Sequence, residues 1–171
     1  MNTGLLNLTK KGFQLSNFYE NSIMELNQDF KEFIELLNEK QVEYLVVGGY
    51  AVGFHGHPRY TGDIDFWVAI SRENAEKIIT VLNEFGMRAL ALQAEDFMKE
   101  DMIIQIGYEP NRIDILTSVT GVSFEDCYAQ KIRAEFDEII VDFIDIRNLR
   151  KNKAASGRGK DLGDLENLPE Y

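Results

Sequence analysis

Two aspartates separated by a single residue, Asp63 and Asp65, are the side chains of this sequence best suited to chemistry. Successive side chains of a strand point to opposite faces, so both aspartates would share one face while Ile64 enters the core. Two adjacent carboxylates repel each other, and a protein rarely tolerates them without a counter-charge. A divalent cation supplies that charge, and ligands that are all oxygen suit Mg²⁺. The pattern predicts a metal-dependent site for phosphoryl or nucleotidyl transfer.

A third carboxylate, Asp114, lies among apolar residues in the segment Arg112–Leu116, and it would share its face with Arg112. If this strand lies beside the strand of Asp63 and Asp65, at the usual spacing of about 4.8 Å, all three carboxylates would converge. They would then bind one or two Mg²⁺ ions, which lie roughly 3.5–4 Å apart in two-metal sites. One ion would hold a triphosphate and the other would lower the pKa of an acceptor hydroxyl. Asp114 would be the general base or a ligand of the second ion.

The glycine pair Gly48-Gly49 stands between an apolar strand and a short helix. A triphosphate approaches backbone N–H groups only where no Cβ intrudes, so both glycines are predicted to contact it. Arg59 and Thr61 lie just before Asp63. Arg59 is a candidate contact of the β- or γ-phosphate and Thr61 is a candidate hydrogen-bond donor, while the alternative for each is a contact that stabilises the loop.

Six of the chain's 18 lysines and arginines lie between residues 147 and 160, a stretch with no acidic residue. In a chain of net charge −11 this concentration suggests a contact with phosphate or another polyanion. The alternative is a solvated helix end, where cations interact favourably with the helix dipole. A globally acidic surface makes non-specific binding of nucleic acid unfavourable, but it does not exclude nucleic acid at a local basic patch.

The elements that must position these residues follow from periodicity and turn signals. The apolar run at 43–49 predicts a buried strand, and residues 63–70 predict a second one. Together with the other segments they indicate an α+β domain with one mixed sheet and flanking helices. We expect further strands at 102–108, 112–116, 134–136 and 138–144, and helices at 22–40, 50–57, 72–86, 124–130, 147–155 and 159–168.

The length of 171 residues indicates one folded domain at 22–171, preceded by an N-terminal arm at 1–21. The single cysteine, Cys127, permits no intramolecular disulfide, which fits a cytoplasmic location. The sequence shows neither a secretion signal nor an apolar stretch long enough to span a bilayer, so we expect no membrane partner.

Gly48-Gly49, Asp63-x-Asp65 and Asp114 together resemble the signature of the DNA polymerase β-like nucleotidyltransferase superfamily. The longer patterns Val-Val-Gly-Gly-Tyr-Ala-Val and Arg-Ile-Asp-Ile-Leu-Thr, with the tail Asn-Lys-Ala-Ala-Ser-Gly-Arg-Gly-Lys-Asp-Leu, are similar to small bacterial stand-alone nucleotidyltransferases near the abortive-infection toxin type. The resemblance covers roughly residues 40–170.

The resemblance implies a nucleotidyltransferase fold, Mg²⁺-dependent binding of an NTP, and transfer of a nucleoside monophosphate to an acceptor hydroxyl. It makes the three aspartates metal ligands and assigns the glycine pair to the triphosphate. The tail motif near the nucleotide would comprise Lys153, Arg158, Lys160 and Asp161. One departure is Gly49, because the superfamily usually has a serine whose hydroxyl contacts phosphate.

Three functions follow. The first is a toxin-type enzyme of a toxin–antitoxin pair that modifies tRNA or protein. The second is a nucleotidyltransferase that modifies a small molecule such as an aminoglycoside antibiotic. The third is a catalytically silent nucleotide-binding module or an antitoxin-like module that binds a partner protein. The presence of all three carboxylates argues against silence, and the absence of an obvious acceptor domain argues for it.

Overall fold

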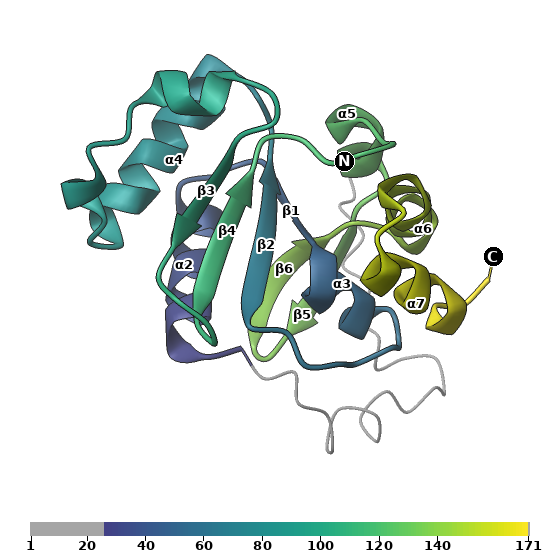
Figure 1. The fold of residues 1–171 in the computed structure, drawn as a ribbon. Coiled ribbons are helices and arrows are strands. Elements are labelled where there is room, and N and C mark those ends of the chain that lie inside the picture. Colours follow the sequence, from purple (N-terminus) through teal and green to yellow (C-terminus); the bar gives the residue numbers. More distant parts are fainter. Residues whose placement is uncertain (1–25, 171) are drawn as a thin grey trace, which may run out of the picture.

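The computed structural model describes residues 26–170. The predicted N-terminal arm and the start of the first predicted helix lie outside this range. A single mixed sheet organises the described part of the chain, which confirms the predicted α+β class (Figure 1). Its strands lie in the order β3-β4-β2-β1-β6-β5. The strands are β1 (Tyr44–Val47), β2 (Asp63–Val68), β3 (Ile103–Ile106), β4 (Arg112–Leu116), β5 (Ile132–Phe136) and β6 (Ile139–Phe143).

Helices connect and cover the strands, close to the predicted positions. The segment after residue 86, for which the periodicity is weak, forms two short 3₁₀ helices, η2 (Arg88–Leu90) and η3 (Ala94–Met98). None of the described helices is both long enough and apolar enough to cross a membrane. The α-helices are α2 (Gln28–Glu39), α3 (Gly48–Phe54), α4 (Arg72–Glu84), α5 (Phe124–Ala129), α6 (Ile146–Ser156) and α7 (Gly159–Asn167).

Two helix starts are fixed by side-chain caps. The hydroxyl of Ser71 accepts a hydrogen bond from the backbone N–H of Asn74, and this cap begins α4. The carboxylate of Asp145 accepts from the backbone N–H groups of Arg147 and Asn148, and this cap begins α6. Each cap satisfies backbone donors that the first turn of a helix leaves unpaired. The cap of α6 matters most for the site, because this helix carries Lys153.

The side chains of β2 alternate between the two faces of the sheet, which pack against different elements. Phe66 lies on the face covered by α2, where its ring centroid is 5.3 Å from that of Phe33. Trp67 points to the other face and meets Phe124 of α5 at 5.1 Å. Because side chains alternate along a strand, Asp63 and Asp65 lie on the face of Trp67. In Figure 1, α3, α6 and α7 also lie on that side of the sheet.

One boundary differs from the prediction and bears on the site. Gly48 and Gly49 were expected to end the first strand, but β1 ends at Val47 and both glycines form the first turn of α3. The cause is the backbone of Gly48, whose φ of +64° lies in the left-handed region. That conformation is open to glycine at little cost and turns the chain out of the extended strand. The glycine pair therefore begins the helix next to the aspartates.

Candidate metal centre

Parallel pairing of β2 with β4 brings the three predicted aspartates together. The register sets Asp65 opposite Asp114 and Asp63 opposite Arg112. One carboxylate oxygen from each aspartate lies within 4.8 Å of the others, so the three residues could hold a metal ion. Asp114 is buried, whereas Asp63 and Asp65 are half-buried. The predicted convergence required these two strands to be neighbours, and β2 and β4 are paired directly.

The carboxylate of Asp65 is the one that lacks a protein partner within residues 26–170. No donor of the described chain hydrogen-bonds to this half-buried carboxylate. Burial, together with the nearby carboxylates of Asp63 and Asp114, raises the pKa of Asp65 to about 7. Lys153 and Arg112 act in the opposite direction, but they do not offset burial and repulsion. A carboxylate in this setting gains stability from an added cation, which is the physical case for a metal here.

Arg112 is the cation that the site already contains. Its Nε donates to Asp114 Oδ1 at 2.8 Å, and its Nη2 donates to Asp63 Oδ2 at 2.6 Å and to Asp114 Oδ2 at 3.1 Å. These bonds raise the pKa of Arg112 further above its usual value. Arg112 was not among the predicted site residues. The signal was its position two residues before Asp114, on the same face of the strand.

Gln105 on β3 is a second residue that the sequence did not single out. Its Nε2 donates to Asp114 Oδ2 at 3.1 Å, and the antiparallel register of β3 with β4 sets it opposite that aspartate. Only knowledge of the pairing of these two strands would have identified it. Gln105 and Arg112 together fix the orientation of the Asp114 carboxylate.

The glycine pair allows α3 to approach the carboxylates closely. A Cβ at position 48 would overlap the carboxylate of Asp65, and a Cβ at position 49 would lie 2.8 Å from the Oγ1 of Thr61. Thr61 in turn donates from Oγ1 to Asp63 Oδ1 at 2.7 Å. A serine at position 49 would therefore require Thr61 to move. Gly49, the departure from the superfamily pattern, is the residue that leaves room for this threonine hydroxyl.

Basic residues of the C-terminal helices are held in a network of ion pairs. Lys153, buried on α6, pairs through Nζ with Asp161 at 2.6 Å and with Asp164 at 3.0 Å. Arg59 donates from Nε to Asp164 Oδ1 at 2.7 Å, and Arg158 donates from Nε to Asp161 Oδ2 at 2.6 Å. In this structure Arg59 thus makes a stabilising contact with α7, and its contact with phosphate stays a prediction.

The network also sets the charge of its carboxylates. Burial disfavours a charged Asp161, but hydrogen bonds from Lys153, Ser156 and Arg158 outweigh it and lower the pKa of Asp161 to about 2. Hydrogen bonds from Arg59 and Lys153 likewise lower the pKa of Asp164 despite its burial. Both aspartates are therefore anions near neutral pH, and they anchor α7 to α6 and to the segment before β2.

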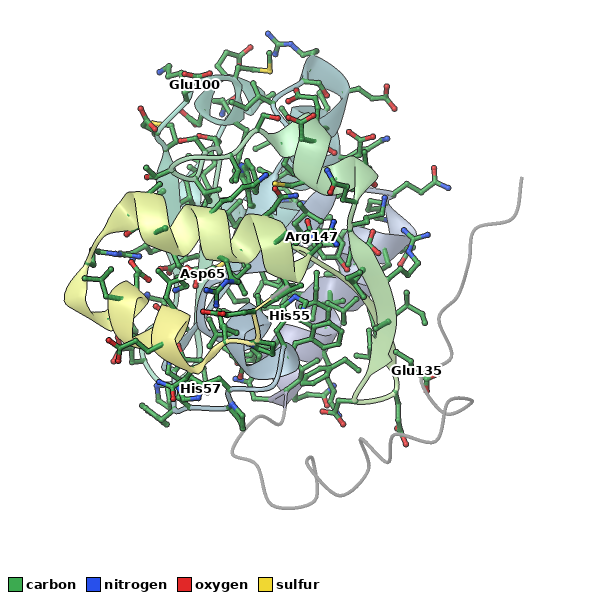
Figure 2. The ribbon with its side chains drawn as sticks, turned by 90° about the vertical axis from the view of Figure 1, so that its right-hand side faces the viewer. His55, His57, Asp65, Glu100, Glu135 and Arg147 are labelled. Carbon is green, nitrogen blue, oxygen red and sulfur yellow. The ribbon has the colours of Figure 1, made fainter. Side chains whose placement is uncertain are left out.

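A single cleft of about 660 Å³ gathers every residue that the sequence predicts for the site. Figure 2 looks onto α6 and α7 and shows Asp65 at the level of these two helices. Apolar side chains of Ile103, Leu116 and Val119 complete part of the wall. The predicted residues in the lining are Gly48, Gly49, Arg59, Thr61, Asp63, Asp65, Asp114, Lys153, Arg158, Lys160 and Asp161.

Comparison with known proteins adds no identification. No family model and no curated protein matches the sequence. The nucleotidyltransferase resemblance therefore rests on the residues named above, and the geometry of the cleft is the independent observation beside it.

Proposed function

We propose that the protein is a Mg²⁺-dependent nucleotidyltransferase that moves a nucleoside monophosphate from an NTP to an acceptor hydroxyl. The observation that carries the proposal is the convergence of Asp63, Asp65 and Asp114 from two paired strands within 4.8 Å. A carboxylate without a partner in the described chain, Asp65, completes a set of ligands that are all oxygen, as Mg²⁺ prefers. Two adjacent strands hold these ligands more rigidly than loops would.

The residues take distinct roles in this scheme. Asp63 and Asp65 would hold one Mg²⁺ with Asp114, which would also accept the proton of the acceptor hydroxyl or bind a second ion. Bound Mg²⁺ would neutralise charge on the phosphates and lower the pKa of the attacking hydroxyl. Gly48 leaves the backbone near the carboxylates uncovered, so that a phosphate would meet N–H groups there.

Charges around the cleft favour a phosphate on the side of α6 and α7. Arg59, Lys153 and Arg158 share the two carboxylates of Asp161 and Asp164, so this network has a net charge of 3 − 2 = +1. The exposed cation Lys160 adds to it. Arg158 has a 77% exposed side chain and lines the cleft, and it is the best placed of these cations to reach a ligand. A local positive wall reconciles phosphate binding with the overall charge of −11.

The cleft indicates only the class of acceptor that the enzyme would use. A hydroxyl-bearing macromolecule such as tRNA or protein fits an enzyme whose cleft opens to the surface without a second domain in residues 26–170, and it fits the resemblance to toxin-type enzymes. A small-molecule acceptor is the second candidate, favoured by the apolar wall of Ile103, Leu116 and Val119. Nucleotide binding without transfer is the outcome that would assign the chain to a silent module.

Calorimetry tests the proposal. Each NTP is titrated into the protein with Mg²⁺ and with EDTA, and we expect binding that requires Mg²⁺. Asp65→Asn should abolish this binding, because it removes the ligand that has no partner in the described chain. Glu135→Gln is the matched control, since this exposed carboxylate lies on β5 outside the cleft (Figure 2). The absence of binding at millimolar NTP, or binding equal in Asp65→Asn, would refute the proposal.

Transfer is tested next with NTPs labelled on the α-phosphate. Total tRNA, a protein extract and an aminoglycoside serve as separate acceptors. Label should reach one of them with wild-type protein and with Glu135→Gln, and not with Asp65→Asn. Binding without label transfer to any acceptor would support the silent module.

A further inference from the structure

Two of the three aspartates already accept hydrogen bonds from protein donors through the oxygens that could bind a metal. Asp63 accepts from Thr61 at Oδ1 and from Arg112 at Oδ2. Asp114 accepts from Arg112 at both oxygens and from Gln105 at Oδ2. A metal ion that binds all three aspartates would therefore share carboxylates with the guanidinium.

The guanidinium also contributes to the net charge of the site. When all three carboxylates are ionised, they and the guanidinium of Arg112 have a net charge of −2, and Asp65 is the carboxylate that no donor of the described chain hydrogen-bonds. A divalent cation and a guanidinium on the same oxygens repel each other strongly at this distance. A metal ion and the guanidinium in its present position therefore compete for the charge of the same carboxylates.

We propose that Arg112 is a positioning residue that holds Asp63 and Asp114 in register before substrate arrives and then transfers to the phosphates of the nucleotide. The inference rests on the proposed function. When metal and nucleotide bind together, the displaced guanidinium can pair with the phosphates of the nucleotide, because the Arg112 side chain lines the same cleft. When the metal arrives alone, the guanidinium loses two carboxylates and gains no comparable partner.

The proposal predicts that Arg112 opposes the bare metal and favours the metal–nucleotide complex. The remaining partner, Glu109 at 3.1 Å from Nη1, is 62% exposed and is a weak substitute for the two aspartates. A planar guanidinium suits phosphate because it donates two parallel hydrogen bonds. Loss of Arg112 should therefore change the two affinities in opposite directions, which a merely structural role would not do.

Two binding measurements on four proteins test the inference. Mn²⁺ is the metal probe, with free ion measured by electron paramagnetic resonance, and a non-hydrolysable ATP analogue with Mg²⁺ is the nucleotide probe, measured by calorimetry. The proteins are the wild type, Arg112→Met, Arg112→Lys and Arg133→Met. Arg133 is the matched control, because it forms the same two-bonded pair with Asp142 at 2.7 and 2.8 Å, outside the cleft.

We expect Arg112→Met to bind Mn²⁺ about tenfold more tightly than the wild type and the Mg²⁺–nucleotide complex about tenfold more weakly, as removal of one close charge implies. Arg112→Lys should shift both affinities in the same directions but less, because lysine keeps the charge and loses the paired donors. This variant also serves if Arg112→Met fails to fold. Arg133→Met should bind both probes like the wild type.

The outcomes separate this inference from the proposed function. Mg²⁺-dependent nucleotide binding that is unchanged in both Arg112 variants would overturn the role of Arg112 and leave the function standing. Weaker binding of both probes in Arg112→Met would also overturn it, since the arginine would then only support the site. No binding of either probe by any of the four proteins would overturn the function and the inference together.

Discussion

Gly48 offers the sharpest test of how α3 and the aspartates fit together. Its φ of +64° and the position of the Asp65 carboxylate each oppose a side chain. Gly157 at the end of α6 has nearly the same φ, +63°, but a Cβ there meets nothing within 4 Å. Gly48→Ala and Gly157→Ala therefore both pay the cost of a left-handed backbone, but only the alanine at position 48 collides with Asp65.

The magnitudes follow from these two terms. An L-residue in the left-handed region costs about 1–2 kcal/mol, which is the whole loss expected for Gly157→Ala. An added methyl group in a filled space costs typically ~1–3 kcal/mol more, so Gly48→Ala should lose about 2–5 kcal/mol. The collision also pushes Asp65 from its place, so Mn²⁺ affinity should fall at least tenfold in Gly48→Ala and not at all in Gly157→Ala.

Urea unfolding and Mn²⁺ titration provide the two readouts. A third variant, Gly48→Ala with Asp65→Gly, removes the atoms that collide, so its added methyl group should cost no more than the one at position 157. Equal losses of stability for the two single variants would refute the reasoning. So would unchanged Mn²⁺ affinity in Gly48→Ala, because Asp65 would then not lie where the structure has it.

Two further predictions concern Gly49 and Asp161. Gly49→Ser should lower the free energy of unfolding by about 1–3 kcal/mol through overpacking, and Thr61→Ala in the same chain should restore most of it, as urea unfolding of the four variants would show. Asp161 has its pKa lowered to about 2 by folding, so its charge stabilises the protein above the unfolded value of 3.8 and ceases to do so as pH falls towards 2. The stability difference between wild type and Asp161→Asn should thus be full at pH 6 and shrink between about pH 4 and pH 2 in urea titrations; a difference that stays constant over this range would contradict the assignment.

Local patterns predicted much of the fold. The apolar run before the glycine pair and the period of α2 and α4 are short-range signals, and each of these elements lies close to its predicted place. The beginning of α3 was misplaced because the left-handed backbone of Gly48 is not specified by the glycine itself. A glycine adopts that conformation or an extended one almost equally well.

The site required information that local patterns do not contain. That Asp63 and Asp65 share a face follows from alternation alone, whereas their closeness to Asp114 depends on which strands pair. The basic stretch at 147–160 was interpreted as a contact with phosphate or another polyanion, or as a solvated helix end; within it, Lys153 is buried between two aspartates. Sequence composition identifies such charges, but the partners that neutralise them come from α7 and are visible only in three dimensions.

The pairing of β2 with β4 has a consequence for folding. The two strands are joined through α4, η2, η3 and β3, and the Arg59–Asp164 pair that holds α7 closes a loop of 105 residues. Contacts so distant along the chain form late, because loop-closure entropy opposes them until most of the fold exists. Asp114 is therefore apart from Asp63 and Asp65 until β2 and β4 pair. An ion or nucleotide that binds only the fully folded cleft would raise the free energy of unfolding, which would make ligand occupancy a reporter of folding as well as of function.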